Sequence, residues 1–164
     1  MFSKLKNIIT NKKNEKITKF LVPVSGEIIS LDTVDDDVFS QRMMGDGFAI
    51  IPSDGNVFSP FDGIVTSIFP TKHAITIKNS DGIEVLIHFG LDTVNLKGEG
   101  FTAHVSSEDR VKAGDLILSV DIASIKDKVK SLVVPIIFLD LKERNFTYNK
   151  QNVNCKDTNA VFIK

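Results

Sequence analysis

Hydrophobic and polar positions alternate in short runs from Phe20 onward. Gly, Pro, Asn and Asp interrupt these runs roughly every 8–12 residues, a spacing typical of all-β domains. The runs with the clearest alternation or β-branched content are Glu27–Leu31, Gly47–Ile51, Gly63–Phe69, Ala74–Lys78, Glu84–Phe89, Leu116–Val120 and Pro135–Leu139. Only Val38–Met44 and Ile122–Lys130 favour a few short helical turns. We therefore expect an all-β barrel or sandwich.

One turn motif occurs twice in the chain. Residues 22–28 read Val-Pro-Val-Ser-Gly-Glu-Ile, and residues 59–65 read Ser-Pro-Phe-Asp-Gly-Ile-Val. In each copy proline fixes the turn, glycine permits a positive φ, and a strand is expected to follow. Together with the all-β pattern, the two copies favour a duplicated, pseudo-symmetric half-barrel.

Length and composition indicate one folded domain behind a basic tail. A chain of 164 residues, with 42% hydrophobic and 25% charged residues, can bury enough apolar surface to fold as one unit. Residues 1–20 hold six Lys and one Glu, and the apolar residues between Phe2 and Ile9 follow a helical spacing. We expect a domain at 21–164 and a tail at 1–20, either flexible or an amphipathic helix in weak contact with an anionic membrane surface.

The chain also has the features expected of a cytoplasmic protein. It has no run of 18 apolar residues, and its N-terminus lacks the continuous apolar stretch of a secretory signal. Cys155 is the single cysteine and cannot form an internal disulfide, which fits a reducing compartment.

Charge is distributed unevenly along the chain. The net charge is −1, and because residues 1–20 contribute +5, the remainder carries −6. Between Leu21 and Thr71 the sequence has one base, Arg42, against eight acids. A body this acidic argues against nucleic-acid binding and favours a basic protein partner.

Two histidines flank a predicted β-hairpin. The run Asn-Ser-Asp-Gly at residues 79–82 separates two β-rich segments and is a strong turn signal. A two-residue turn at its centre pairs residues whose numbers add up to 161, which places His73 directly opposite His88. Ile75 and Leu86 would then lie beside them on the same face. We expect two adjacent imidazoles in an apolar patch.

The histidine pair has three interpretations from the pattern alone. Repulsion keeps at least one ring neutral, and a neutral ring nitrogen can carry a phosphoryl group while the second ring donates a hydrogen bond to it. The pair could instead supply two zinc ligands, or be a packed cross-strand pair without chemistry. The sequence has no phosphate-binding loop or kinase signature, so a nucleotide donor is not expected.

The sequence near these histidines indicates a docking surface. Asp35-Asp36-Asp37 precedes Val38-Phe39 and Met43-Met44, which joins acidic and apolar side chains as docking of a basic partner requires. His104 lies outside the hairpin, and we expect it to be structural or exposed.

Longer stretches of the sequence resemble the glucose-family enzyme IIA (EIIA) component of the bacterial phosphoenolpyruvate-dependent sugar phosphotransferase system. The similarity is carried by Gly-Asp-Gly-Phe-Ala-Ile at 45–50, Thr-Lys-His-Ala at 71–74, and above all the string VLIHFGLDTVNLKGEGF at 85–101. It runs from about Val22 to the C-terminus, except that the Asn-rich stretch 144–159 does not align clearly.

The resemblance implies an antiparallel β-sandwich with a shallow, exposed active site. His88 matches the histidine that is phosphorylated on Nε2, and His73 matches the neighbour that stabilises the phosphoryl group. Thr71 matches a threonine that hydrogen-bonds within the pair, and the Gly90 carbonyl is expected to accept from His88 Nδ1–H. Matches to the partner-docking surface are Asp36, Val38, Phe39, Met43, Met44, Phe69, Ile75, Leu86, Asp92 and Val94.

The resemblance also implies a phosphoryl relay that counts as a phosphotransferase. The phosphocarrier protein HPr would phosphorylate His88, which would pass the group to a cysteine in the IIB domain of a sugar permease. No cofactor is required, although zinc could bind His73 and His88 in a regulatory complex whose third protein ligand is undefined.

Three other classes of protein share part of this sequence pattern. A zinc peptidase on a similar duplicated half-barrel would need further ligands, and the sequence has no His-x-His. A biotinyl or lipoyl carrier domain, superficially similar at Val111–Leu116, would need a lysine at a hairpin tip. A regulatory binding protein that changes partners with phosphorylation is compatible with the relay.

Overall fold

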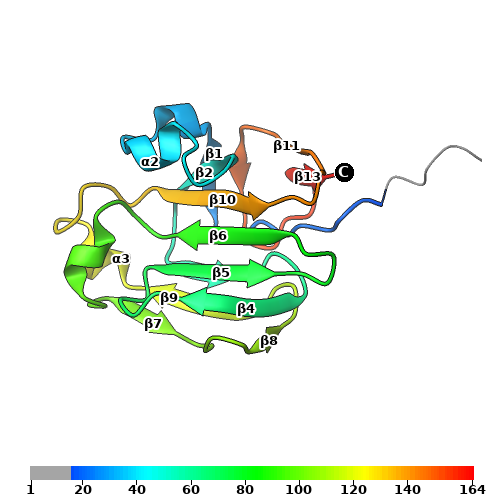
Figure 1. Ribbon diagram of the computed structural model, residues 1–164. Coiled ribbons are helices and arrows are strands. Elements are labelled where there is room, and N and C mark those ends of the chain that lie inside the picture. The colour runs from blue at the N-terminus through cyan, green and yellow to red at the C-terminus, as the bar shows by residue number, and fades with distance from the viewer. Residues whose placement is uncertain (1–15) are drawn as a thin grey trace, which may run out of the picture.

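Three antiparallel sheets build the part of the chain that the computed structural model describes, residues 16–164 (Figure 1). The largest sheet has eight strands in the order β12-β1-β2-β10-β6-β5-β4-β8, and the others are β3-β9-β7 and β11-β13. The strands are β1 (Gly26–Ile29), β2 (Gly47–Pro52), β3 (Asn56–Phe58), β4 (Gly63–Ile68), β5 (Ala74–Lys78), β6 (Glu84–His88), β7 (Phe101–Ala103), β8 (Arg110–Val111), β9 (Leu116–Val120), β10 (Val134–Asp140), β11 (Phe146–Tyr148), β12 (Asn152–Val153) and β13 (Val161–Ile163). The short helices are η1 (Leu31–Thr33), α2 (Asp37–Ser40), η2 (Thr93–Leu96) and α3 (Ile122–Ile125). The all-β prediction is confirmed.

Side-chain alternation along β6 divides the packing into an inner and an outer layer. Val85 and Ile87 belong to the main core, which the eight-stranded sheet shares with β3, β7 and β9. Leu86, between them, belongs to a smaller cluster on the opposite face, together with Leu31 of η1 and Phe39 of α2. Successive side chains of a strand point to opposite faces, so His88 shares the outer face with Leu86. The outer face of β6 therefore carries the histidine.

The expected duplication is visible in the order of the eight-stranded sheet. The strands that begin at the two repeated glycines, β1 and β4, each lie second from an edge, and each pairs with a short edge strand. Gly26 pairs with Val153 of β12, and Gly63 pairs with Val111 of β8. A Cβ on either glycine would lie 1.9 or 2.4 Å from a carbonyl oxygen of the next strand. Both glycines are therefore needed for the close strand approach.

The turns before these strands repeat the same hydrogen bond. The Ser25 hydroxyl accepts from the Cys155 N–H, and the Asp62 carboxylate accepts from the Ala113 N–H, each at 2.8 Å. The acceptors are 37 residues apart and the donors 42 residues apart, so the two halves of the sheet correspond to each other. The half-barrel repeat is therefore present in backbone pairing as well as in sequence.

The folded domain begins earlier than residue 21. Thr18 pairs with Ile163, and the Phe20 ring is 2% exposed and makes edge-on contacts with core phenylalanines. The assignment of residues 16–20 to a tail is therefore wrong. Burial of the large apolar Phe20 side chain is favourable, and it holds this segment against the domain. The amphipathic pattern between Phe2 and Ile9 lies outside the described residues. No helix in residues 16–164 has the length and apolar character to cross a membrane.

The described N-terminal segment lies at the far end of the β5–β6 hairpin from His88. Lys16 Nζ is 2.7 Å from Asp81 in the hairpin loop, and Arg144 also contacts Asp81. In Figure 1 this loop is on the right, near the C-terminus, whereas α2 and the end of β6 lie on the left. The N-terminal residues that the structure describes, from Lys16 onward, therefore lie away from the end of the hairpin that carries His88.

Candidate phosphoryl-transfer site

The two predicted histidines lie in contact at one end of the β5–β6 hairpin. The ring centroids of His73 and His88 are 4.8 Å apart, and the rings meet edge to face. Phe39 packs against His88 at 4.9 Å, and Phe69 packs against His73 at 5.4 Å. Four aromatic rings thus form a continuous row, which places both imidazoles in apolar surroundings.

The predicted strand register is wrong by one residue. His88 pairs with Ala74, and Lys78 pairs with Glu84, so paired numbers add up to 162. The Asn79 N–H donates to the Ile83 carbonyl, which leaves Ser80, Asp81 and Gly82 as a three-residue loop with Gly82 at φ +84°. Glycine in this left-handed position closes a three-residue hairpin in place of the expected two-residue turn.

The rings still meet because a tight turn directly precedes β5, which begins at Ala74. Lys72 has a φ of +60°, and its N–H donates to the Phe69 carbonyl in a tight turn. His73 therefore stands just outside the strand, where its carbonyl accepts from the Phe89 N–H at 2.7 Å. The prediction that the imidazoles touch is confirmed, although a turn and not direct cross-strand pairing brings them together.

The shifted register removes Ile75 from the docking surface. Ile75 pairs with Ile87, is 2% exposed and belongs to the main core. The expectation that Ile75 lies on the outer face beside the histidines is therefore wrong. Leu86 does lie on the outer face, where it is buried beneath the site.

Hydrogen bonds fix the protonation of the His88 ring. His88 Nδ1 lies 2.8 Å from the Gly90 carbonyl oxygen, which can only accept, so Nδ1 carries the hydrogen. The neutral ring then has a free lone pair on Nε2. His73 Nδ1 lies 2.7 Å from the Thr71 hydroxyl, as the resemblance implied. If that hydroxyl donates, His73 Nε2 carries the hydrogen and can donate in turn.

Both Nε2 atoms are open to an incoming group. Among residues 16–164, neither Nε2 has a hydrogen-bond partner, yet no buried side-chain nitrogen or oxygen lacks one. The two atoms are therefore reached by solvent. They open into a pocket of about 240 Å³, lined by Asp36, Val38, Phe39, Met44, Phe69, His73, Leu86, His88, Asp92, Thr93 and Val94.

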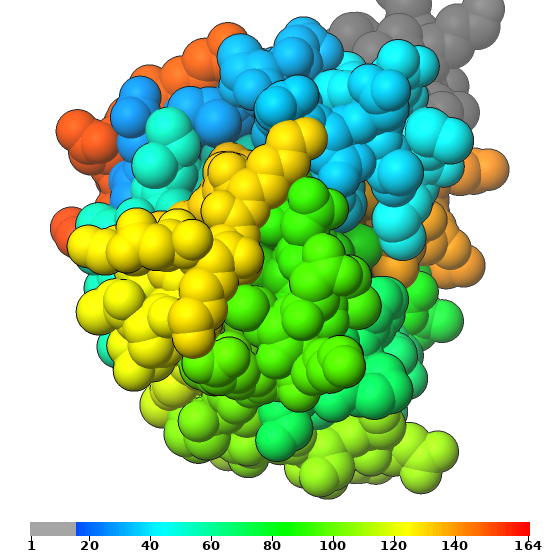
Figure 2. All heavy atoms as spheres, turned by 90° about the vertical axis from the view of Figure 1, so that its left-hand side faces the viewer, coloured from blue at the N-terminus to red at the C-terminus, as the bar shows by residue number. Residues whose placement is uncertain are grey.

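Three segments of the chain build the rim of this pocket: α2 with the loop after it, the turn at Phe69, and the segment between β6 and β7. The light-blue to cyan atoms of η1, α2 and the loop after it meet the green atoms of the segment between β6 and β7 in Figure 2. Asp36 caps α2 by accepting from the Val38 N–H at 2.9 Å. Asp92 has a φ of +59° and precedes η2. Both predicted carboxylates therefore lie at the rim.

Exposure separates the expected docking residues into a rim and a floor. Phe39 and Leu86 are buried and form the floor of the pocket. The exposed apolar side chains of the rim are Val38, Met43, Met44, Phe69 and Val94. Met43 is the most exposed of these at 70% and stands beside the pocket without lining it.

Thr93 is a pocket residue to which the sequence pattern did not point. Its side chain is fully buried, and its hydroxyl donates to the Phe89 carbonyl at 2.8 Å. This bond holds the turn after β6, where the Gly90 N–H donates to the Val133 carbonyl. A β-branched polar residue directly after Gly-Leu-Asp was the one available signal. The third histidine, His104, is exposed and contacts the Ser119 hydroxyl.

Burial sets the charge of the histidine pair. Two effects lower the pKa of His73 to about 4: desolvation is the larger, and repulsion from His88 is the smaller. Desolvation also lowers the pKa of His88, opposed by the Gly90 hydrogen bond and the Asp36 carboxylate. Both rings are therefore neutral at pH 7, as a nucleophile and a neutral donor require.

Stability is expected to fall on acidification through His73. The unfolded histidine takes up a proton near pH 6.5, whereas the folded His73 does so near pH 4. Between these values only the unfolded state gains the proton, so the free energy of unfolding falls by about 3 kcal/mol as the pH drops. Urea unfolding of the wild type and of His73→Leu, repeated from pH 7 to pH 4, measures this contribution. Parallel curves for the two proteins would contradict the assignment.

Gly90 is expected to tolerate no side chain. Its φ is +82°, and a Cβ would lie 2.5 Å from Thr93 Cγ2. Because Thr93 is buried, Gly90→Ala should cost about 2 kcal/mol or more in unfolding free energy and should slow phosphorylation by displacing the His88 acceptor. Gly98→Ala is the control, since its φ is +91° but its Cβ would meet only the Thr71 carbonyl oxygen at 3.8 Å. Equal losses for the two variants, measured in urea, would show that backbone conformation alone accounts for the effect.

The described residues offer the histidine pair no metal-ligand set. Among residues 16–164, no group of three or more His, Cys, Asp or Glu side chains could hold a metal ion. Two imidazoles leave a zinc ion short of the ligands of a closed site. The geometry therefore gives no support to the zinc-peptidase alternative.

Comparisons with known proteins agree on one family. Residues 18–144 match the family described as phosphoenolpyruvate-dependent sugar phosphotransferase system, EIIA 1. The glucose-specific EIIA component of Oceanobacillus iheyensis is 52% identical, covering 80% of this chain and 81% of the relative. That of Halalkalibacterium halodurans is 44% identical, covering 100% and 98%.

A longer relative and a solved structure extend the comparison. The glucosamine-specific EIICBA component of Bacillus subtilis is 49% identical over 85% of this chain, which spans 22% of that relative's length. The glucose permease IIA of Mycoplasma capricolum superposes with a TM-score of 0.84 at 42% identity, covering 90% of this chain and 96% of that one. The chain therefore belongs to the EIIA 1 family of the phosphoenolpyruvate-dependent sugar phosphotransferase system.

Proposed function

We propose that this chain relays phosphoryl groups through His88 Nε2. The observation that carries the proposal is the bond from His88 Nδ1–H to the Gly90 carbonyl, which leaves a bare nitrogen on a neutral ring in an open pocket. Family membership supports the same role, since EIIA components are phosphotransferase relay proteins of the sugar phosphotransferase system.

The transfer can be written with its bonds balanced. The lone pair of His88 Nε2 attacks the phosphorus of a phosphohistidine on HPr, and the phosphorus–nitrogen bond of that donor breaks as the new one forms. Nδ1 keeps its proton, held by Gly90, throughout. In the second step a thiolate of the IIB domain attacks the same phosphorus, and Nε2 leaves with its lone pair restored. Energy stored in phosphohistidine drives both steps, so no cofactor is required.

The lining of the pocket suits a carrier more than a permanent acceptor. Among the described residues that line it, none is Lys or Arg, whereas Asp36 and Asp92 stand at the rim. Hydrogen bonds from neutral groups such as His73 can orient the phosphoryl oxygens without the strong ion pair that a guanidinium would form. The group is therefore held in place but remains easy to pass on.

The rim supplies a docking surface for protein partners. Exposed Met43 and Met44 are flexible and adapt to different contacts, which suits a surface that meets HPr and a IIB domain in turn. The nearby carboxylates favour basic partners. We place this relay in the cytoplasm, with the sugar itself bound elsewhere.

Zinc is proposed only for a complex with a regulatory partner. His88 could provide one ligand through Nε2, and His73 a second once its hydrogen sits on Nδ1 and the Thr71 hydroxyl accepts it; the partner would have to supply the rest. Such binding would block the nucleophile and therefore compete with phosphorylation.

Mapping the phosphate tests the relay directly. The purified chain is incubated with phosphoenolpyruvate, enzyme I and HPr, and we expect one acid-labile phosphate on His88 Nε2. A stable label, or a label on another residue, would overturn the proposal.

A further inference from the structure

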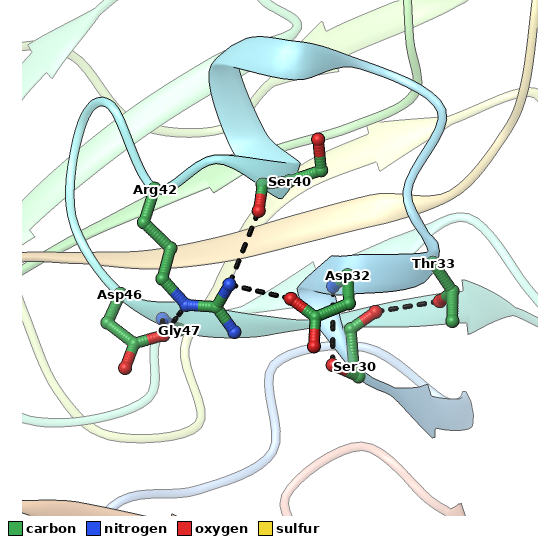
Figure 3. A network of polar contacts seen from close by, with 7 residues as sticks. All are labelled: Ser30, Asp32, Thr33, Ser40, Arg42, Asp46 and Gly47. Atoms are coloured by element: carbon green, nitrogen blue, oxygen red, sulfur yellow. Dashed lines mark hydrogen bonds and ion pairs between the residues drawn. The ribbon is translucent and has the colours of Figure 1, made fainter.

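Arg42 joins three segments beside the phosphoryl-transfer pocket. Its Nη1 donates to Asp32 of η1 at 2.7 Å and to the Ser40 carbonyl at the end of α2 at 3.3 Å. Its Nε donates to Asp46, directly before β2, at 2.8 Å. Figure 3 shows the guanidinium between the two carboxylates, below the end of α2.

The partners of Arg42 are themselves fixed to the backbone. The Asp46 carboxylate also accepts from the Gly47 N–H at 2.8 Å, and the Asp32 N–H donates to the Ser30 hydroxyl at 3.2 Å. The guanidinium holds the pKa of Asp32 below its ordinary value. Arg42 thus bonds two carboxylates at once through different nitrogens, which the fixed planar fork of a guanidinium allows better than a single ammonium does.

The loop that this clamp closes carries the two rim methionines. Met43 and Met44 lie between Arg42 and Asp46, and Met44 lines the pocket. Arg42 itself has a φ of +56°, and the Gly45 N–H donates to its carbonyl. The backbone therefore turns sharply, and the side-chain bonds of Arg42 hold the position of that turn.

We propose that Arg42 is a positioning residue for partner docking, which it serves by holding the Met43–Met44 loop at the rim of the pocket. This inference rests on the proposed relay. Exposed ion pairs add little to overall stability. The bonds from Arg42 to Asp32 and Asp46 should therefore matter less for the free energy of unfolding than for the position of this loop. The Arg42 side chain bonds to Asp32, Ser40 and Asp46 and does not line the pocket, so its effect on docking passes through Met44.

The sign of the change in KM separates positioning from electrostatics. Arg42→Gln makes the surface more acidic, which by charge alone would lower the KM for a basic phosphocarrier. Loss of positioning should instead raise the KM for phospho-HPr about fivefold with kcat nearly unchanged. Lys142→Gln, which removes an equal charge beside Asp140 at the far end of β10, is the control and should leave KM unchanged. Arg42→Lys should recover only part of the loss.

A double-variant cycle tests whether Arg42 acts through Met44. In the Met44→Ala background, Arg42→Gln should add little to KM, because the side chain it positions is gone. Additive effects, an unchanged KM or a lowered KM would each overturn the inference. If the wild type itself is not phosphorylated by phospho-HPr, the proposed relay fails instead, so the two failures are distinguishable.

Discussion

A His88→Ala variant incubated with phosphoenolpyruvate, enzyme I and HPr should take up no acid-labile phosphate. The variant loses the one ring whose Nδ1–H is held by the Gly90 carbonyl and whose Nε2 lone pair faces the pocket. His73 should not replace it, because Thr71 holds its Nδ1 and burial leaves the ring a weak base even without His88. Transfer of radiolabel from phospho-HPr, followed by gel separation under alkaline conditions, measures the effect.

His104→Ala is the matched control for this experiment. The residue is exposed, contacts Ser119 and stands outside the row of rings, so its loss should leave labelling at the wild-type level. A His88→Ala protein that still retains label, with its folding verified by circular dichroism, would disprove the assignment of the nucleophile.

The longer strands could be predicted from the sequence because their own residues specify them. Ala74–Lys78 and Leu116–Val120 form β5 and β9 with the predicted bounds. Strands of two or three residues, such as β8 and β12, could not be predicted, because their apolar pattern is too short to show a period. These strands form through pairing with β4 and β1, a tertiary effect.

The C-terminal region illustrates the same limit. The Asn-rich stretch 144–159 carries β11 and β12, although it has little hydrophobic alternation. Main-chain bonds to β13 and β1 stabilise these strands from outside the stretch. Only the structure shows that this region takes part in the repeat, since the hydrogen bond at Cys155 copies the one at Ala113.

The candidate site was predictable in its residue types and less so in its register. Adjacent histidines followed from the hairpin, but the left-handed conformation of Gly82 shifted the pairing by one residue and moved Ile75 into the core. A glycine at the end of a turn fits loops of two or three residues, so the sequence alone did not fix this choice. The rings are in contact despite this shift because the turn at Lys72 places His73 just outside β5, where it is not bound by the strand register.

Replacement of His73 should impair the second half-reaction more than the first. His73→Leu fills most of the space of the ring but removes its hydrogen bond donor. During acceptance, HPr orients the phosphoryl group that it delivers, so we expect a loss below about tenfold. Between partners the group rests on this chain alone, and the loss of a preorganised donor should slow transfer to the IIB cysteine on the order of a hundredfold.

Separate assays of the two half-reactions decide this point. Label uptake from phospho-HPr gives the first rate, and label loss from the isolated phosphoprotein to a purified IIB domain gives the second. Thr71→Val is the companion variant, because it removes the hydroxyl at His73 Nδ1 while keeping the imidazole. It should shift the losses in the same direction by a smaller factor, since the ring remains but its tautomer is no longer fixed. Equal losses in both half-reactions would instead mean that His73 serves only to pack between His88 and Phe69.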